Sequence, residues 1–276
     1  MASVPLRNEI FAANRAVGRI ALAVAAGPGG SRRTRLHEAG SLRARFPNGN
    51  GRTLDAVIVN VAGGMTGGDC FDIGIEAGPG AELSVTTAAA EKIYRSLGPD
   101  TEISVKLGVG PGAALAWLPQ ETILFDRARL RRRIDVDLAC GASLLLAEAT
   151  IFGRSAMGET VLSGHFSDRW RVRTEGALVF AETVKLDGGI AQHLAERAVA
   201  GGGASVASVL KIPGGEENVA AVRAMQQDFA GEVGASAWNG LALVRCVAAD
   251  GAALRRDLVK VLMALGAGPL PRLWMN

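Results

Sequence analysis

The sequence predicts a mainly β fold of stacked antiparallel β-sheets built from repeated hairpins, with two or three α-helices in the C-terminal third. Three observations predict it. Apolar and polar residues alternate along several segments before about residue 190, a Gly-Ala pair recurs along the same region, and helical periodicity appears only afterwards.

The alternating segments are the candidate strands. Residues 20–26 fit a half-buried strand, although their composition also resembles the apolar core of a secretory signal. Further alternation runs through residues 71–76, 102–109 and 134–138. A period of two gives each strand one buried face and one solvated face, which is typical of antiparallel sheets.

A Gly-Ala pair marks an internal repeat. The pairs follow one another after 32, 29 and 35 residues, and an apolar residue stands three positions after each glycine. The pairs are Gly80-Ala81, Gly112-Ala113, Gly141-Ala142 and Gly176-Ala177. Glycine allows the positive φ of a tight reversal, so we expect each pair to close one hairpin of a stack.

Helices are predicted at residues 192–200, 216–230 and 252–265, the last with Asp250 as its N-cap. Strand-like segments resume at 205–210 and 241–247, so the glycine triplet at 201–203 does not separate domains. We therefore expect a single domain over residues 1–276, β-rich over 1–190 and mixed over 191–276.

Composition excludes several classes of protein. The 276 residues carry a net charge of only +3, too little to indicate nucleic-acid binding, and no apolar run is long enough to span a membrane. The three cysteines form no CxxC pair, which excludes a disulfide framework and a zinc knuckle and fits a reducing, cytoplasmic location.

The densest glycine cluster, Gly63-Gly-Met-Thr-Gly-Gly-Asp69, is not a phosphate-binding loop. It lacks the lysine and the Ser/Thr that such a loop needs, and Asp69 would repel phosphate. A tight loop with close backbone approach and a surface for a partner or an ion around Asp69 both remain open.

Glu148 lies in a run, residues 144–152, that is apolar on both strand faces and is therefore expected to be buried on both. An unpaired carboxylate in such a place costs several kcal/mol. Glu148 is therefore protonated, paired, with Arg154 the nearest arginine along the chain, or part of the lining of a wet path.

The other charged residues and the histidines indicate a function less clearly than Glu148 does. Glu121 and Asp126 are either the acid and base of an enzyme or the edge residues of a hairpin. The arginines of residues 129–133 are expected to form a solvated strand edge. The three histidines have no ligand spacing, so no tight metal site is predicted, and a transient site of carboxylates stays open.

Several motifs, taken in order, resemble the urease accessory protein UreD family, also called UreH. They are the 63–69 cluster, Thr87 with Lys92-Ile-Tyr-Arg-Ser96, Trp117-Leu-Pro-Gln-Glu-Thr-Ile-Leu-Phe-Asp126, Glu148 with Gly153-Arg-Ser-Ala-Met-Gly-Glu159, and Leu270-Pro-Arg-Leu-Trp274. Many relatives have Pro-Gly where this chain has Ala88-Ala89, so the backbone of that turn is expected to differ.

The resemblance implies a β-rich, non-catalytic protein. It would join UreF-like and UreG-like accessory proteins to apo-urease subunits and pass nickel transiently through an internal passage, with no permanently bound cofactor, no nucleic acid and no membrane. The acidic residues implied for the path are Asp69, Asp126 and Glu148. The residues implied for structure or docking are Gly63, Gly64, Gly67, Gly68, Thr87, Tyr94, Arg95, Gln120, Gly153 and Arg154.

Two other classes of function remain open. A carbohydrate-acting hydrolase would use Glu121, Asp126 or Glu148 as acid and base, but 5% aromatic residues supply few platforms for sugar rings. A purely structural β module would bind the same partners as a UreD-like protein without carrying any metal.

Overall fold

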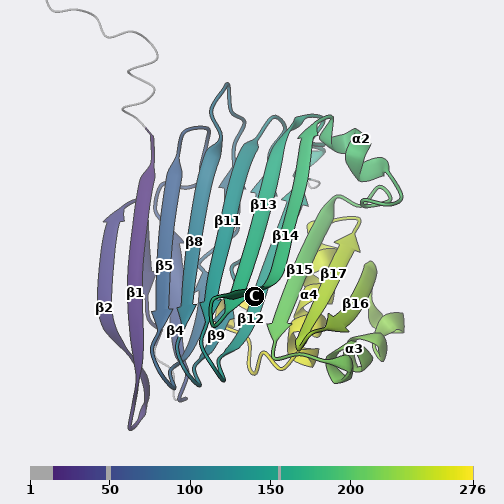
Figure 1. Cartoon of the computed structure of the whole chain (residues 1–276). Coiled ribbons are helices and arrows are strands. Elements are labelled where there is room, and N and C mark those ends of the chain that lie inside the picture. The colour runs from purple at the N-terminus through teal and green to yellow at the C-terminus, as the bar shows by residue number, and fades with distance from the viewer. Residues whose placement is uncertain (1–14, 48–50, 155–156, 276) are drawn as a thin grey trace, which may run out of the picture.

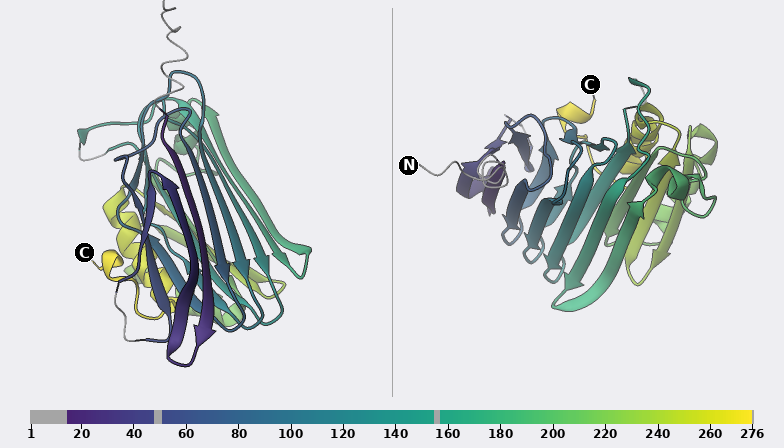
Figure 2. Two further views of the ribbon diagram at one scale, coloured as in Figure 1. Left: turned by 90° about the vertical axis from the view of Figure 1, so that its left-hand side faces the viewer. Right: turned by 90° about the horizontal axis from the view of Figure 1, so that it is seen from above.

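The computed structural model of this chain describes residues 15–47, 51–154 and 157–275. Two sheets lie face to face, and helix α4 (Gly251–Ala264) packs on the outer face of the second sheet (Figures 1 and 2). We call them the front sheet and the back sheet. Residues 1–14 of the predicted domain, Ser155 and Ala156 of the predicted 153–159 motif, and Asn276 lie outside the described residues.

The front sheet contains seven strands within the described residues, in the order β14-β13-β11-β8-β5-β1-β2 (Figure 1). They are β1 (Val17–Gly27), β2 (Gly30–Gly40), β5 (Cys70–Ala77), β8 (Thr101–Val109), β11 (Arg129–Leu138), β13 (Gly164–Thr174) and β14 (Ala177–Gly188). The expectation of a strand at residues 20–26 is confirmed by β1.

The back sheet has the order β16-β17-β15-β12-β9-β6-β4-β3, with β10 paired to β12 and β7. Its strands are β3 (Leu42–Arg45), β4 (Leu54–Asn60), β6 (Glu82–Thr87), β7 (Glu91–Ile93), β9 (Ala114–Trp117), β10 (Thr122–Leu124), β12 (Ser143–Phe152), β15 (Ser205–Ile212), β16 (Glu232–Trp238) and β17 (Leu241–Ala248).

The chain crosses repeatedly between the two sheets, so that equivalent strands of successive repeats stack side by side. These strands pair in parallel: β5 with β8 and β8 with β11 in front, β6 with β9 and β9 with β12 behind. The mainly β class and the stacked repeats are confirmed, but the predicted antiparallel pairing is wrong for these central strands. Antiparallel pairs occur towards the ends, as in β1–β2, β13–β14 and β15–β17.

The reason lies in what covers each sheet. Alternation predicts antiparallel strands because parallel sheets usually have helices on both faces. Here the front sheet buries only the face turned towards the back sheet, as in β8, whose residues alternate between buried and less buried along its length. A stack of parallel repeats therefore produces the same period of two.

The predicted Gly-Ala turns stack on one another. Gly80, Gly112 and Gly141 each join a front strand to a back strand, with φ of 65°, 63° and 68°. The backbone N–H of Gly80 donates to Pro111 O at 2.9 Å, and that of Gly112 donates to Cys140 O at 3.2 Å. The fourth pair, Gly176-Ala177, forms the β13–β14 hairpin instead.

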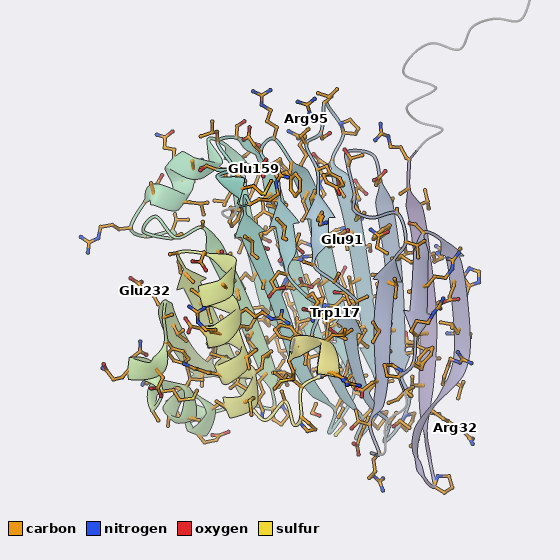
Figure 3. All side chains as sticks on the ribbon, turned by 180° about the vertical axis from the view of Figure 1, so that it is seen from behind. Arg32, Glu91, Arg95, Trp117, Glu159 and Glu232 are labelled. Carbon is orange, nitrogen blue, oxygen red and sulfur yellow. The ribbon has the colours of Figure 1, made fainter. Side chains whose placement is uncertain are left out.

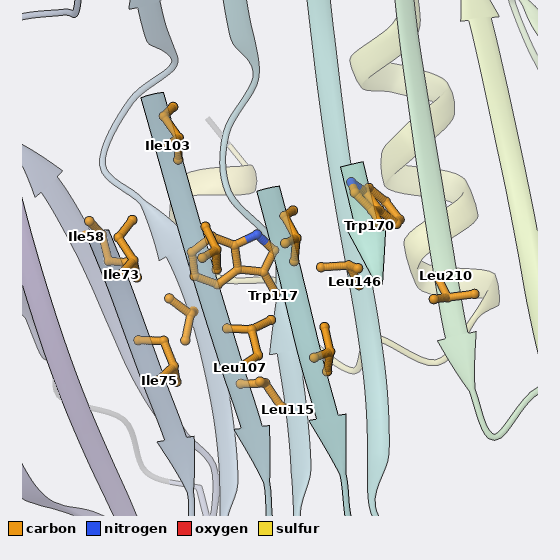
Figure 4. Close-up of a cluster of buried hydrophobic side chains, with 14 of the residues drawn as sticks. Ile58, Ile73, Ile75, Ile103, Leu107, Leu115, Trp117, Leu146, Trp170 and Leu210 are labelled. Carbon is orange, nitrogen blue, oxygen red and sulfur yellow. The ribbon is translucent and has the colours of Figure 1, made fainter. Parts of the chain in front are cut away.

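The same register aligns a leucine ladder in the core. Leu83 lies opposite Leu115, and Leu115 lies opposite Leu144, on three neighbouring back strands. All three are at most 2% exposed. Figure 4 shows Leu115 and Leu107 among the apolar side chains that fill the space between the sheets.

Strand β12 is buried on both faces, as the sequence predicts. Leu144 and Leu146 belong to the core between the two sheets, whereas Leu145 and Ala147 belong to a second core beneath α4. Glu148 follows the parity of Leu144 and Leu146, so it faces the front sheet from a strand that has no solvated side.

The described residues contain three α-helices, all in the C-terminal third as expected: α2 (Ile190–Ala195), α3 (Glu216–Arg223) and α4. Asp250 caps α4 by accepting a hydrogen bond from the N–H of Ala253 at 2.8 Å. The helix predicted over 216–230 ends at Arg223, and the 3₁₀ helix η2 (Gln226–Asp228) follows it. A second 3₁₀ helix, η3 (Arg272–Trp274), lies near the C-terminus.

In the part of the chain that the structure describes, no helix is long and apolar enough to cross a membrane.

The leucine ladder yields a prediction about stability. Leu115→Ala leaves a cavity between two neighbouring ladder residues and should lower the free energy of unfolding by about 2–5 kcal/mol. The matched control is Leu97→Ala, because Leu97 is 92% exposed and should contribute less than about 0.5 kcal/mol. Urea unfolding followed by tryptophan fluorescence measures both, and equal midpoints for the two variants would contradict the assignment.

Candidate functional site: a buried ion cluster between two cavities

Two cavities between the sheets meet at one point. The larger has a volume of about 280 Å³ and is lined by exposed Gly63, Ala89 and Lys92 at one end. The smaller, about 30 Å³, has room for only one or two water molecules and runs towards Glu182. Arg132 and Glu148 line both cavities, so the junction is made by a buried pair of opposite charges.

Arg132 is the centre of a buried ion cluster, which we define as Trp117, Arg132, Glu148, Asp168 and Trp170. One guanidinium nitrogen of Arg132 donates to Glu148, and the other donates to Asp168 at 2.6 Å. The indole of Trp117 donates to the second oxygen of Glu148 at 2.9 Å, and that of Trp170 donates to Asp168 at 3.1 Å. The cluster thus joins the two sheets.

The strands explain how these side chains meet. Trp117 and Glu148 come from the back sheet, on β9 and β12, and the other three come from the front sheet, on β11 and β13. Figure 4 shows Trp117 and Trp170 in the layer between the sheets, at the level where the cluster lies. Each of the five residues has the parity of its strand's buried apolar positions. All five side chains therefore point into the layer between the sheets.

The electrostatics follow from burial. Arg132 is 3% exposed and Glu148 5%, so neither charge is solvated and each depends on the other. Burial raises the pKa of Glu148 to about 7, against the opposing effect of Arg132. The two carboxylates of Glu148 and Asp168 raise the pKa of Arg132 above its usual range despite its burial. Arg132 therefore stays protonated.

Glu91 lines the larger cavity closer to its open end. Asn60 Nδ2 donates to both of its carboxylate oxygens, at 3.0 and 3.2 Å. Burial raises the pKa of Glu91 to about 7, with the hydrogen bond from Asn60 acting in the opposite direction. Figure 3 shows Glu91 between Arg95, at one end of the sheets, and Trp117, further along the strands.

The glycine cluster at 63–69 is a tight loop with close backbone approach. A Cβ on Gly64 would lie 2.5 Å from the Tyr94 ring, and one on Gly67 would lie 1.9 Å from Ser96 Oγ. Gly63 and Gly68 have φ of 80° and 90°. Tyr94 also donates its hydroxyl hydrogen to Gly63 O at 3.0 Å, so its ring and hydroxyl hold the loop.

Asp69 fixes this loop from within. Its carboxylate accepts hydrogen bonds from the N–H groups of Ala16, at 2.8 Å, and Thr66, at 2.7 Å. Thr66 donates in turn to the backbone oxygen of Arg95, whose side chain is exposed. Asp69 lines neither of the cavities that contain Glu148.

Asp126 likewise binds backbone. It accepts from the N–H groups of Leu162, at 2.8 Å, and Ser163, at 3.1 Å. Gly153 has a φ of 91°, and a Cβ there would lie 2.4 Å from Glu159 O. Arg154 binds Glu159 at 2.7 Å and stacks over Phe125, so it does not pair with Glu148 as its nearness along the chain suggested.

The remaining predicted residues border the larger cavity. Thr87 Oγ1 accepts from the N–H of Gln120 at 2.9 Å and donates to Ala89 O at 3.1 Å, which fixes the turn that holds Ala88 and Ala89. Gln120 accepts from Arg255 at 2.8 Å, and so does Glu121. Glu121 and Asp126 therefore bind different partners and do not form the paired acid and base of a hydrolase.

Sequence reasoning missed Arg132, Asp168 and Trp170. The prediction of a solvated edge at 129–133 is wrong for Arg132, because β11 lies between β8 and β13 rather than at an edge. A signal was present, since Arg132 shares its strand parity with Leu130 and Ile134, which are buried. The inward face of β11 thus includes an arginine between two buried apolar residues.

The side chains that commonly bind metal ions are scattered over the described part of the chain. Over residues 15–47, 51–154 and 157–275, no group of three or more His, Cys, Asp or Glu side chains is placed to hold a metal ion. His165 binds Asp187 at 3.1 Å, and Cys70, Cys140 and Cys246 are free. The carboxylates that line the two cavities are those of Glu91, Glu148, Asp168 and Glu182.

Comparison with known proteins places these features in a family. A family model described as UreD urease accessory protein matches residues 16–275. A protein of Rhodopseudomonas palustris (strain BisA53) named urease accessory protein UreD is 57% identical, over 98% of this chain and 94% of its own length. One of Bradyrhizobium diazoefficiens with the same name is 54% identical, over 98% of this chain and 97% of its own.

Glu91 yields a pH-dependent prediction. Its pKa is about 7 in the folded protein and about 4.3 in an unfolded chain, so between these values only the folded state holds the proton. The free energy of unfolding therefore falls as pH rises from about 4.5 to about 7, by on the order of 3–4 kcal/mol. Glu91→Gln should remove this contribution and be more stable than the unmodified chain at pH 8.

Urea midpoints at pH 5 and pH 8 measure the effect, with exposed Glu232 on β16 changed to Gln as the control. If the midpoint of Glu91→Gln changes with pH as much as that of the unmodified chain, Glu91 does not hold the proton.

Proposed function

Because this chain belongs to the UreD family of urease accessory proteins, we propose that it is a non-catalytic scaffold that passes nickel ions through its interior during urease maturation. Its partners on this proposal are UreF-like and UreG-like accessory proteins and apo-urease subunits, in the cytoplasm. Nickel is the cargo and passes transiently, with no resident cofactor.

The observation that carries the proposal is the row of carboxylates along the two cavities. Glu91 lines the larger cavity, Glu148 stands at the junction, and Asp168 and Glu182 line the smaller one. Carboxylate oxygens bind Ni²⁺ less tightly than imidazole or thiolate donors do, which suits an ion that has to be released. Of the acidic residues implied by the family resemblance, Glu148 has the strongest support because it alone lines both cavities.

The far end of this row is closed by a second ion pair. Glu182 binds Arg245 at 2.5 Å, and the Arg245 side chain is 58% exposed. Val184, beside Glu182 in the smaller cavity, is 37% exposed, so the row approaches solvent at the open side between β14 and β15. On this proposal, an ion leaves at this side. If a partner protein covers it, the ion passes from the carboxylates of this chain to ligands of the partner without entering bulk water.

Partner docking is supported at the open end of the larger cavity. The loops there carry large apolar side chains exposed to solvent. Groups of exposed apolar side chains typically mark surfaces that bind another protein. They are Val61 (59% exposed), Tyr94 (37%), Leu97 (92%), Met157 (73%) and Leu162 (65%). Figure 3 shows Arg95 and Glu159 at this same end. Tyr94, Arg95 and Arg154 are the docking residues that this placement supports.

Glu148→Gln tests the passage. The amide keeps the size of the side chain but removes a charged donor from the junction, so we expect nickel incorporation into urease and urease activity to fall about tenfold or more. The change is made in cells that express the whole urease operon, and both quantities are measured after purification.

The matched control is Glu121→Gln, which removes another buried carboxylate from an ion pair, with Arg255, outside both cavities. We expect it to activate urease as the unmodified chain does. Co-purification with the accessory partners checks that both variants assemble. Full activation by Glu148→Gln would remove Glu148 from the path.

A further inference from the structure

The junction between the two cavities is occupied by a side chain of the protein itself. Arg132 and Glu148 alone, among the described residues, line both cavities. The guanidinium lies between Glu148 of the back sheet and Asp168 of the front sheet, bonded to both. Whatever moves from one cavity to the other has to pass this group.

Arg132 is held by its two terminal nitrogens but not by its Nε. One of its terminal nitrogens donates to Thr122 Oγ1 at 3.1 Å as well as to Glu148, and the other donates to Asp168. Its Nε is buried and has no hydrogen-bond partner among the described residues. A buried N–H without a partner costs free energy, so the resting position is not fully satisfied.

The charges of the cluster leave a place for a divalent cation. With both acids ionised, the two carboxylates and one guanidinium sum to −1, and the two carboxylates without Arg132 sum to −2. The indoles of Trp117 and Trp170 each donate a hydrogen bond to one of the two carboxylates, so each acid keeps a partner when the guanidinium moves. Oxygen donors facing each other from two sheets form a site that a divalent metal ion would neutralise.

We propose that Arg132 is a tethered cation that closes the passage, occupying between Glu148 and Asp168 the place that a divalent ion takes as it crosses from one cavity to the other. The proposal rests on the proposed passage and adds its regulation. In this buried setting two cations cannot share the site, because their repulsion is far stronger than in water. An entering ion therefore displaces the guanidinium, for which the larger cavity offers about 280 Å³.

The arrangement explains how a row of carboxylates can carry nickel without storing it. With Arg132 in place, the resting protein presents no vacant pair of acids. Once the ion has left, the guanidinium returns and restores the cluster. Removing the charge of Arg132 should then convert a transient position into a lasting metal site.

Arg132→Met tests this directly on the protein co-purified with its accessory partners, with Ni²⁺ alone as the probe. We expect equilibrium dialysis to show one additional Ni²⁺ per chain, bound at least about tenfold more tightly than by the unmodified chain at this position. Arg132→Lys keeps the positive charge and should bind no additional ion. The triple change R132M/E148Q/D168N should lose the added site, and equal binding by Arg132→Met and the unmodified chain would overturn the proposal.

Asp168→Asn supplies a second test that does not leave two unpaired acids in the core, because Arg132 keeps Glu148 as its partner. It removes half of the proposed ion position, so urease activation should fall as it does for Glu148→Gln while the complex still assembles. Normal activation by Asp168→Asn, with reduced activation by Glu148→Gln, would overturn the role of Glu148 and Asp168 as a shared ion position. It would not contradict the proposed passage. Normal activation by both variants would overturn the passage itself.

Discussion

Hydrogen bonds between equivalent strands of successive repeats fix the register on which everything else in this protein depends. They set Leu83, Leu115 and Leu144 side by side in the back sheet and align the turns at Gly80, Gly112 and Gly141. The same register decides which residues of the front sheet face which residues of the back sheet. A slip of one position would turn every inward side chain outward and would separate Arg132 from Glu148.

Within that register, the buried charge of Arg132 meets one acid, Asp168, on the neighbouring strand of its own sheet and a second, Glu148, on the opposite sheet. Arg132 satisfies two acids, and two indoles satisfy the oxygens that remain. Such a cluster contributes little net stability compared with an apolar core, since desolvation offsets most of the attraction between the charges. The cluster lies at the meeting point of two cavities and joins the two sheets. On our proposal, the same position makes it the point that an ion has to pass.

The sequence predicts the β class, the repeat and the capped helix after Asp250, because these follow from local patterns in the chain. It does not distinguish parallel from antiparallel stacking, since both leave one face of each strand wet. Burial of Glu148 was predictable from the apolar residues on both sides of it. Its partner was not, because Arg132 lies 16 residues away on the other sheet whereas Arg154 is nearer along the chain. The roles of Asp69 and Asp126 as backbone acceptors depend on loops that meet only in three dimensions.

The most direct measurement of the central claim is urease activity in cells that carry the urease operon with this gene deleted, with and without added nickel. We expect activity to be lost while apo-urease still accumulates, and to return when the intact gene is restored. Full urease activity in the deletion strain at ordinary nickel concentrations would contradict a role for this chain in urease maturation.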